Sequence, residues 1–195
     1  LEKRGIKVLA MFEHGVRHMT NHRTPIRKPE DMKGLKIRVM EQPIYIEMMK
    51  ALGASPTPMA FGELFTAMQQ GVVDGQENPA AHIWTSRFFE VQKYISLTAH
   101  TYSAEPLLIS MSVWGTLPEN HRASIQQAAD EARDWQRDLC RKLENEFWDN
   151  IRASGKSEIN DDVDKAAFME VTKPVWAMFE DKLGKENIEA IVNVK

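Results

Sequence analysis

Two arginines, Arg17 and Arg38, carry the type of side chain best suited to holding an anion. A planar guanidinium meets a carboxylate with two parallel charge-assisted hydrogen bonds, so two arginines converging on one cleft would clamp an organic acid. Residue type alone leaves a second interpretation open, in which each arginine pairs with a surface acid such as Glu41 or Asp31. The positions of the two arginines in the fold decide between these interpretations.

A second candidate site is the segment VDGQENP, from Val73 to Pro79. Its pattern is typical of a strand end, a tight turn and the start of a helix, a junction whose backbone N–H groups favour anions. Asn78 could reach a ligand there, or it could cap the helix, a position where asparagine is common. Both interpretations are open from the residues alone.

Three histidines, His14, His18 and His22, are spaced four residues apart. On a helix they would share one face in the manner of metal ligands, which makes a metal-dependent hydrolase an alternative function. Gly15 and Asn21 argue against a helix here, so we predict ordinary polar histidines and no metal. No nucleophile elbow, phosphate-binding glycine loop, zinc spacing or nucleotide fingerprint is found, so the sequence predicts no catalytic residue and no cofactor.

The composition excludes several classes of function. The chain has 195 residues, of which 43% are hydrophobic and 27% charged, and its formal net charge is -3. This balance gives no overall attraction to nucleic acids or to anionic membranes. The single cysteine, Cys140, excludes an intrachain disulfide, and no apolar run is long enough to span a bilayer. We therefore expect no nucleic-acid partner and no direct membrane insertion.

Short strands alternate with helices along the chain, which predicts an α/β fold with a mainly parallel or mixed sheet. The expected strands cover residues 6–12, 35–39, 72–73, 94–101, 107–113 and 156–160. The expected helices cover residues 42–52, 61–70, 79–89 and 161–183, the last capped by Asp161 and Asp162, and residues 13–28 are expected to be rich in turns. Arg38 then lies at the carboxyl end of a strand, the edge where open α/β sheets bind ligands.

The longest predicted element runs from Pro118 to Gly155. Apolar residues, Trp135 among them, recur every three or four positions from Ile125 to Ile151, as on one face of a single helix. At 1.5 Å per residue this helix would be about 50 Å long, which exceeds the width of a small domain. We therefore expect it to bridge two bodies.

Four segments together resemble the solute-binding proteins of tripartite ATP-independent periplasmic (TRAP) transporters, of the DctP type. They are PEDMKGLKIRV at 29–39, ALGASPTPMAFGEL at 51–64, AMQQGVVDGQENP at 67–79 and FEVQKY at 89–94. The resemblance implies the two-lobe fold of type II periplasmic binding proteins, with crossing strands and a long helix that joins the lobes. It also implies a periplasmic protein that catalyses nothing, captures an organic anion such as a C4-dicarboxylate or a sugar acid, and delivers it to the TRAP membrane subunits.

The resemblance assigns roles to individual residues. Arg38 matches the arginine that forms a salt bridge with the ligand carboxylate, and Arg17 matches a second arginine that often joins it. Asn78 matches an asparagine that hydrogen-bonds the ligand, and Phe61 matches an aromatic residue that packs on it. The resemblance thus favours the anion clamp over surface pairing for both arginines.

Two acidic residues complete the site that the resemblance implies. Glu77 resembles the partner that orients the second arginine, and Glu41 occupies a variable position near the ligand where it would help to set specificity. A sensor module built on the same scaffold stays open as an alternative to transport.

The implied lobes divide the chain unevenly. The second lobe, residues 15–103 with 143–171, is expected to be complete, whereas residues 1–14, 104–142 and 172–195 are parts of the first lobe. Family members begin with a secretory signal and most of the first lobe, which have no counterpart in this sequence. We therefore expect an incomplete first lobe and exposed apolar faces on the long helix.

Overall fold

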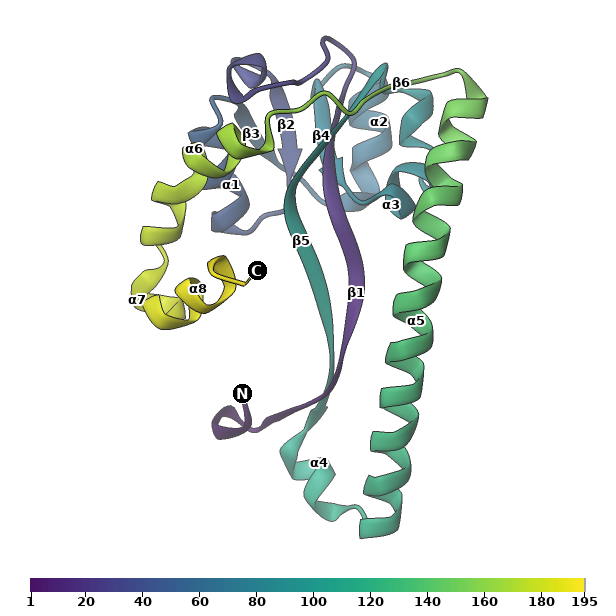
Figure 1. Ribbon diagram of the computed structural model, residues 1–195, viewed down its shortest axis with the longest axis vertical. Coiled ribbons are helices and arrows are strands. Elements are labelled where there is room, and N and C mark those ends of the chain that lie inside the picture. Colours follow the sequence, from purple (N-terminus) through teal and green to yellow (C-terminus); the bar gives the residue numbers. More distant parts are fainter. Residues whose placement is uncertain (195) are drawn as a thin grey trace.

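The computed structural model describes residues 1–194, and a six-stranded mixed sheet lies at its centre (Figure 1). The strand order is β3-β2-β4-β1-β5-β6. The strands are β1 (Ile6–Asn21), β2 (Lys36–Val39), β3 (Ser55–Pro58), β4 (Gly75–Asn78), β5 (Tyr94–Ser110) and β6 (Glu158–Asn160). β2 is parallel to β3 and β4, β5 is parallel to β6, and β1 is antiparallel to β4 and β5. The mixed α/β architecture predicted from the sequence is confirmed.

Helices surround this sheet on both faces. They are α1 (Pro43–Ala51), α2 (Leu64–Gln69), α3 (Ala80–Thr85), α4 (Met111–Thr116), α5 (Glu119–Ser154), α6 (Lys165–Ala177), α7 (Glu180–Leu183) and α8 (Lys185–Val192). Single 3-10 turns occur at Glu2–Arg4, Pro29–Met32, Phe61–Glu63 and Phe88–Glu90. One apolar core includes Met49 of α1 and Phe168 of α6, and a second includes Leu64 of α2, Ile83 of α3 and Ile151 of α5. The sheet is thus fixed from two sides, which gives its strand ends a rigid support.

β1 and β5 form a long antiparallel ribbon that extends well beyond the rest of the sheet (Figure 1). Pairing runs from Ile6 opposite Ser110 to Asn21 opposite Tyr94. The prediction of a turn-rich region at 13–28 is therefore wrong as far as Asn21, and the two strands expected at 94–101 and 107–113 are one. The polar residues that suggested turns are buried in the strand, where side-chain hydrogen bonds satisfy them, as Thr20 does with Gln92.

The turn at Asp74 also differs from the prediction. Residues 72–73 form no strand, and β4 begins instead at Gly75. Gly75 permits β4 to approach β1 closely, because a Cβ atom at this position would lie 2.0 Å from the carbonyl oxygen of Thr20. Asn78 is the last residue of this strand and does not cap α3, whose N-cap is Pro79.

The helix predicted between Pro118 and Gly155 is confirmed as α5, which has 36 residues and a length of about 54 Å. Gly155 ends it with a φ of 64°, the left-handed conformation that glycine adopts without strain. Trp148 and Ile151 are buried near its C-terminal end, whereas Trp135 at its middle is 67% exposed, as expected for an apolar face that is open on this helix. The division of the chain into two lobes stays a prediction.

The C-terminal region contains the three helices α6, α7 and α8. The predicted helix at 161–183 begins only at Lys165 and is divided into α6 and α7. Its N-cap is Asp164, whose carboxylate accepts a hydrogen bond from the backbone N–H of Ala167, so the prediction of caps at Asp161 and Asp162 is wrong. A capping carboxylate must sit one residue before the first helical turn, and only Asp164 does so.

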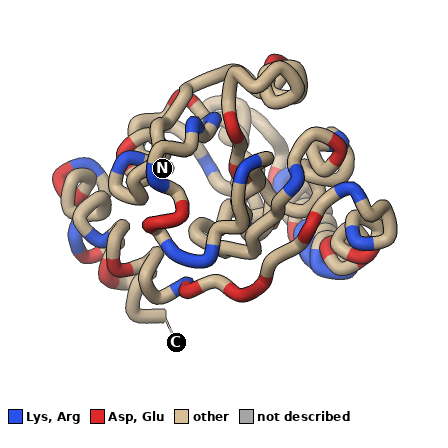
Figure 2. The backbone as a smooth tube through the Cα atoms, turned by 90° about the horizontal axis from the view of Figure 1, so that it is seen from above, with Lys and Arg blue, Asp and Glu red and all other residues tan. Residues whose placement is uncertain are grey.

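Positively and negatively charged residues are interspersed along the backbone of the molecule (Figure 2). This distribution agrees with the small formal net charge of -3. Within residues 1–194 no helix has both the length and the apolar character needed to cross a membrane.

Candidate anion-binding site

The strand topology brings the predicted site residues to one edge of the sheet. Because β2, β3 and β4 are parallel, their carboxyl ends meet at the same edge, with Arg38 in β2 and Asn78 at the end of β4. Phe61 begins the 3-10 turn that follows β3. Strand β1 runs the opposite way and places His18 opposite Asn78, so Arg17 lies at this edge too. Residues far apart in the sequence therefore converge.

Arg17 forms a buried ion pair with Glu77. Its Nη2 donates to Oε1 of Glu77 at 2.8 Å and to the Glu77 carbonyl oxygen at 2.7 Å. The same nitrogen donates to Oδ1 of Asn78 at 3.1 Å. The side chains of Arg17 and Glu77 are 2% and 0% exposed, which excludes surface pairing for this arginine. The pair holds the guanidinium in one orientation at the edge of the sheet.

Arg38 is equally buried but has no carboxylate partner in the described part of the chain. It is 4% exposed, and its Nε donates to the carbonyl oxygen of Met59 at 2.9 Å. Its Cζ lies 5.9 Å from the centre of the Phe61 ring, within cation–π range. Among residues 1–194 its two terminal nitrogens have no hydrogen-bond acceptor, and Glu41, which follows β2, is exposed. Burial lowers the pKa of Arg38 from its usual value, yet an arginine stays charged at neutral pH.

The buried charges at this edge do not balance. Burial by itself would raise the pKa of Glu77, but its contacts with His100 and Arg17 outweigh burial and hold that pKa below its usual value. Glu77 is therefore an anion that neutralises one of two buried arginines. A buried charge without a partner is costly, so the second arginine creates a position that an anion would stabilise.

Three residues of this site were given no individual role by the sequence. His100 of β5 has its Nε2 at 3.4 Å from Oε2 of Glu77, too poorly aligned for a hydrogen bond, since this nitrogen is buried without a partner. Tyr45 of α1 has its ring centre 5.9 Å from Cζ of Arg17, and Gln76 donates to Thr20 Oγ1 at 3.0 Å. Strand pairing and helix packing bring these residues to the site. Neither kind of contact leaves a motif in a single sequence.

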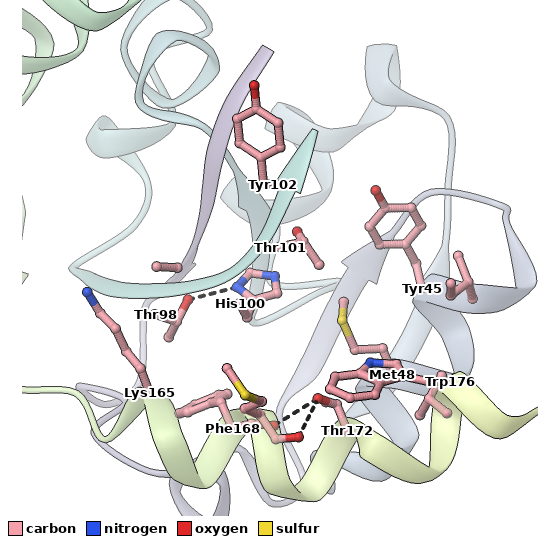
Figure 3. A pocket seen from close by; sticks show the side chains of 14 residues that line it. Tyr45, Met48, Thr98, His100, Thr101, Tyr102, Lys165, Phe168, Thr172 and Trp176 are labelled. Carbon is pink, nitrogen blue, oxygen red and sulfur yellow. Dashed lines mark hydrogen bonds between the residues drawn. The ribbon is translucent and has the colours of Figure 1, made fainter. Parts of the chain in front are cut away.

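A cavity of about 520 Å³ lies beside the site of Arg17 and Arg38, between α1, β5 and α6. Figure 3 shows Tyr45, His100 and Trp176 at its walls, with the hydroxyl of Thr98 directed at the His100 ring. The other labelled residues are mainly apolar or hydroxyl-bearing, with Lys165 as the charged one. The cavity touches the site through Tyr45 and His100, and neither arginine lines it.

The three regularly spaced histidines do not form a cluster, because they belong to a strand and its end instead of a helix. His14 contacts His82 of α3 at 2.8 Å between their Nε2 atoms, and His18 accepts a hydrogen bond from the backbone N–H of Ala99. His22 lies 3.7 Å from Asp74. Over residues 1–194 no group of three or more metal-binding side chains is arranged to hold an ion. The arrangement thus lacks the shared helix face that the hydrolase alternative requires.

Comparison with known proteins identifies relatives over nearly the whole chain. Residues 1–182 match the family model described as bacterial extracellular solute-binding protein, family 7, or DctP. The 2,3-diketo-L-gulonate-binding periplasmic protein YiaO of Escherichia coli is 39% identical over 168 residues, which are 86% of this chain and 51% of that protein. The chain therefore spans about half the length of this curated relative.

Solved structures agree with the family match. A TRAP periplasmic solute-binding protein from Polaromonas sp. JS666 with bound D-erythronate is 41% identical with a TM-score of 0.90 and covers 100% of this chain, which spans 64% of that protein. A second TRAP periplasmic solute-binding protein, from Shewanella oneidensis with bound succinate, is 33% identical with a TM-score of 0.90. The match covers 98% of this chain and 63% of that protein. The expected type of fold is confirmed by these matches. This chain belongs to the bacterial extracellular solute-binding proteins of family 7, the DctP family of TRAP transporters.

Proposed function

We propose that this chain is the solute-gripping part of a TRAP solute-binding protein that captures an organic carboxylate at Arg38 and Arg17. The observation that carries the proposal is the unbalanced burial of two arginines with one carboxylate, Glu77. A solute carboxylate would supply the missing negative charge. Its two oxygens suit the fork of terminal nitrogens of Arg38, for which residues 1–194 supply no acceptor.

The other predicted residues have complementary roles in this proposal. Glu77 holds Arg17 in place, so that Arg17 reaches the solute as a preoriented donor. Asn78 presents its side-chain amide beside Arg17, and Phe61 covers Arg38 and excludes water from the ion pair. Glu41 stands exposed at the same edge, where it would help to set specificity for the rest of the solute.

The relatives indicate the class of solute. YiaO is named for 2,3-diketo-L-gulonate, and the two solved structures contain D-erythronate and succinate. All three solutes are small carboxylates, and two of them also carry several oxygen-bearing groups. We infer that this chain takes part in binding a small hydroxy- or dicarboxylic acid in the periplasm, with TRAP membrane subunits receiving it and no bond made or broken.

A matched pair of solutes tests the proposal. D-Erythronate and erythritol have the same four-carbon polyol character, but only the first carries a carboxylate. We expect D-erythronate or succinate to raise the melting temperature of the protein, since a ligand that binds only the folded state stabilises it by mass action. Erythritol and succinamide should give no shift. Equal shifts with the charged and uncharged members of each pair would contradict carboxylate recognition.

A further inference from the structure

A pair of histidines lies next to the proposed site. In the described chain it forms no hydrogen bond with Arg17 or Arg38. His14 of β1 and His82 of α3 face each other, with 2.8 Å between their Nε2 atoms and 4.7 Å between their ring centres. The ring of His82 also packs against Phe61, at 5.3 Å between centres, and Phe61 covers Arg38. One aromatic ring therefore separates the histidine pair from the unpaired guanidinium.

The contacts of His14 determine where the protons of this pair lie. Oε1 of Glu105 is 3.3 Å from Nδ1 of His14, which favours a proton on Nδ1 and leaves Nε2 of His14 as an acceptor. His82 must then donate through its own Nε2–H, because two facing nitrogens need one donor and one acceptor. One added proton, on the far nitrogen of His82, preserves this hydrogen bond. A second would set two N–H groups against each other, so the pair has room for one proton.

The surroundings of the pair contain both signs of charge. Burial lowers the pKa of His14 and of His82, the charge of Arg17 lowers both further, and Glu105 opposes the lowering. The titratable and charged groups that face the pair are Arg17 of β1, Glu77 of β4, Glu105 of β5, and Glu13, Cys140 and Glu144 around the small cavity that His14 lines. Arg17 is the positive group that disfavours an added proton.

We propose that His14 and His82 form a proton-binding site coupled to anion capture, whose affinity for its one added proton rises when a carboxylate binds at Arg17 and Arg38. This inference rests on the proposed function. A bound carboxylate offsets the positive charge of the arginines and so favours a proton on the pair. By linkage the proton favours the carboxylate equally, and solute affinity rises as the pH falls below the ordinary histidine range of about 6.5.

Calorimetry with D-erythronate tests the coupling, because an α-hydroxy acid of this kind stays ionised well below neutral pH. Titrations at about pH 6 in two buffers with different heats of ionisation measure the protons taken up on binding, and the ordinary pKa of histidine makes about pH 8 the reference. We expect uptake of a fraction of a proton at the lower pH, none at the higher pH, and an affinity about twofold higher at the lower pH. A rise of about half a unit in the pKa of the pair has this effect near that pKa, and reaches about threefold only where the pair is fully protonated.

Variants assign the proton to the pair. His82→Gln removes the ring that carries the added proton and should abolish the uptake, whereas His121→Gln, at an exposed position of α5, should retain it. Ring-nitrogen NMR of the solute-free protein should show His14 protonated on Nδ1 and a single proton added to the two rings together. Two independent titrations with ordinary pKa values would overturn the one-proton pair.

The outcomes separate this inference from the proposed function. Binding of D-erythronate without proton uptake, or with the same uptake in His82→Gln, overturns the coupling and leaves carboxylate recognition in place. If neither D-erythronate nor succinate binds at either pH, the proposed function fails and the coupling fails with it, even where NMR shows the one-proton pair.

Discussion

Replacing Arg38 by methionine should separate solute affinity from stability. The guanidinium is buried with one hydrogen bond, to the carbonyl oxygen of Met59, and no carboxylate partner within residues 1–194. Methionine fills much of the same volume without a charge. Loss of the hydrogen bond costs about 1 kcal/mol and relief of an unpaired buried charge offsets it, so the free energy of unfolding should change by less than about 1 kcal/mol.

The effect on binding should be much larger. Without the guanidinium, the solute carboxylate enters the site with its main partner missing, a penalty of roughly 2–5 kcal/mol. At 1.4 kcal/mol per tenfold change, the dissociation constant should rise about 30-fold or more. Calorimetry with D-erythronate measures this change, and urea unfolding measures the stability.

The matched control is Glu77→Gln, which removes the buried negative charge instead of a positive one. It removes the only buried carboxylate beside Arg17 in the described chain and leaves two positive charges together. Breaking a buried pair in this way costs roughly 3–5 kcal/mol of stability. Our reasoning is refuted if Arg38→Met loses as much stability as Glu77→Gln while D-erythronate binds as tightly as it does to the parent protein.

Three further substitutions probe the scaffold. Gly75→Ala should destabilise the fold by about 1–3 kcal/mol in urea unfolding, because the new Cβ would meet the Thr20 carbonyl. Gly115→Ala is the control, since Gly115 has open space around it and the substitution should not destabilise the fold in this way. Equal effects of the two substitutions would contradict the close approach of β4 to β1. Asp164→Ala should lower the free energy of unfolding by about 1 kcal/mol, because it removes the N-cap of α6. Asp162 is exposed, and Asp162→Ala should be nearly neutral in the same measurement. The reverse order of the two effects would support the cap predicted from the sequence. Burial lowers the pKa of His18 to about 3, so between about pH 6.5 and 3 the unfolded chain binds a proton that the folded chain refuses. Stability should therefore fall as the pH falls through this window, by up to about 1.4 kcal/mol per pH unit, and a His18→Gln variant with the same slope would contradict this assignment.

Local sequence signals were sufficient for the elements whose character depends on neighbouring residues. The regular apolar spacing and the terminal glycine predicted α5 from Pro118 to Gly155, because a helix is built from contacts three and four residues apart. The alternation at Lys36–Val39 predicted β2 with Arg38 near its carboxyl end. The family motifs around Arg38, Phe61 and Asn78 also identify the class of protein without any knowledge of geometry.

Elements whose stability comes from distant partners were predicted less well. Residues 13–21 resemble a loop because they are polar, yet they form a strand paired with β4 and β5, and polar side chains of that strand hydrogen-bond to both neighbours. The ion pair of Arg17 with Glu77 and the contacts of His14 with His82 join residues separated by 60 and 68 positions. No spacing rule within one sequence records such pairs, since they depend on the antiparallel register of β1 with its neighbours.

The sequence by itself thus determined the family, the α/β class and the residue types able to hold an anion, because these follow from local pattern and side-chain chemistry. Tertiary structure alone decided the charge balance of the site. Strand pairing placed Arg17, Arg38 and Glu77 at one edge and buried all three, and burial converts three ordinary charges into a site with one negative charge too few. Solvent would otherwise have screened that imbalance.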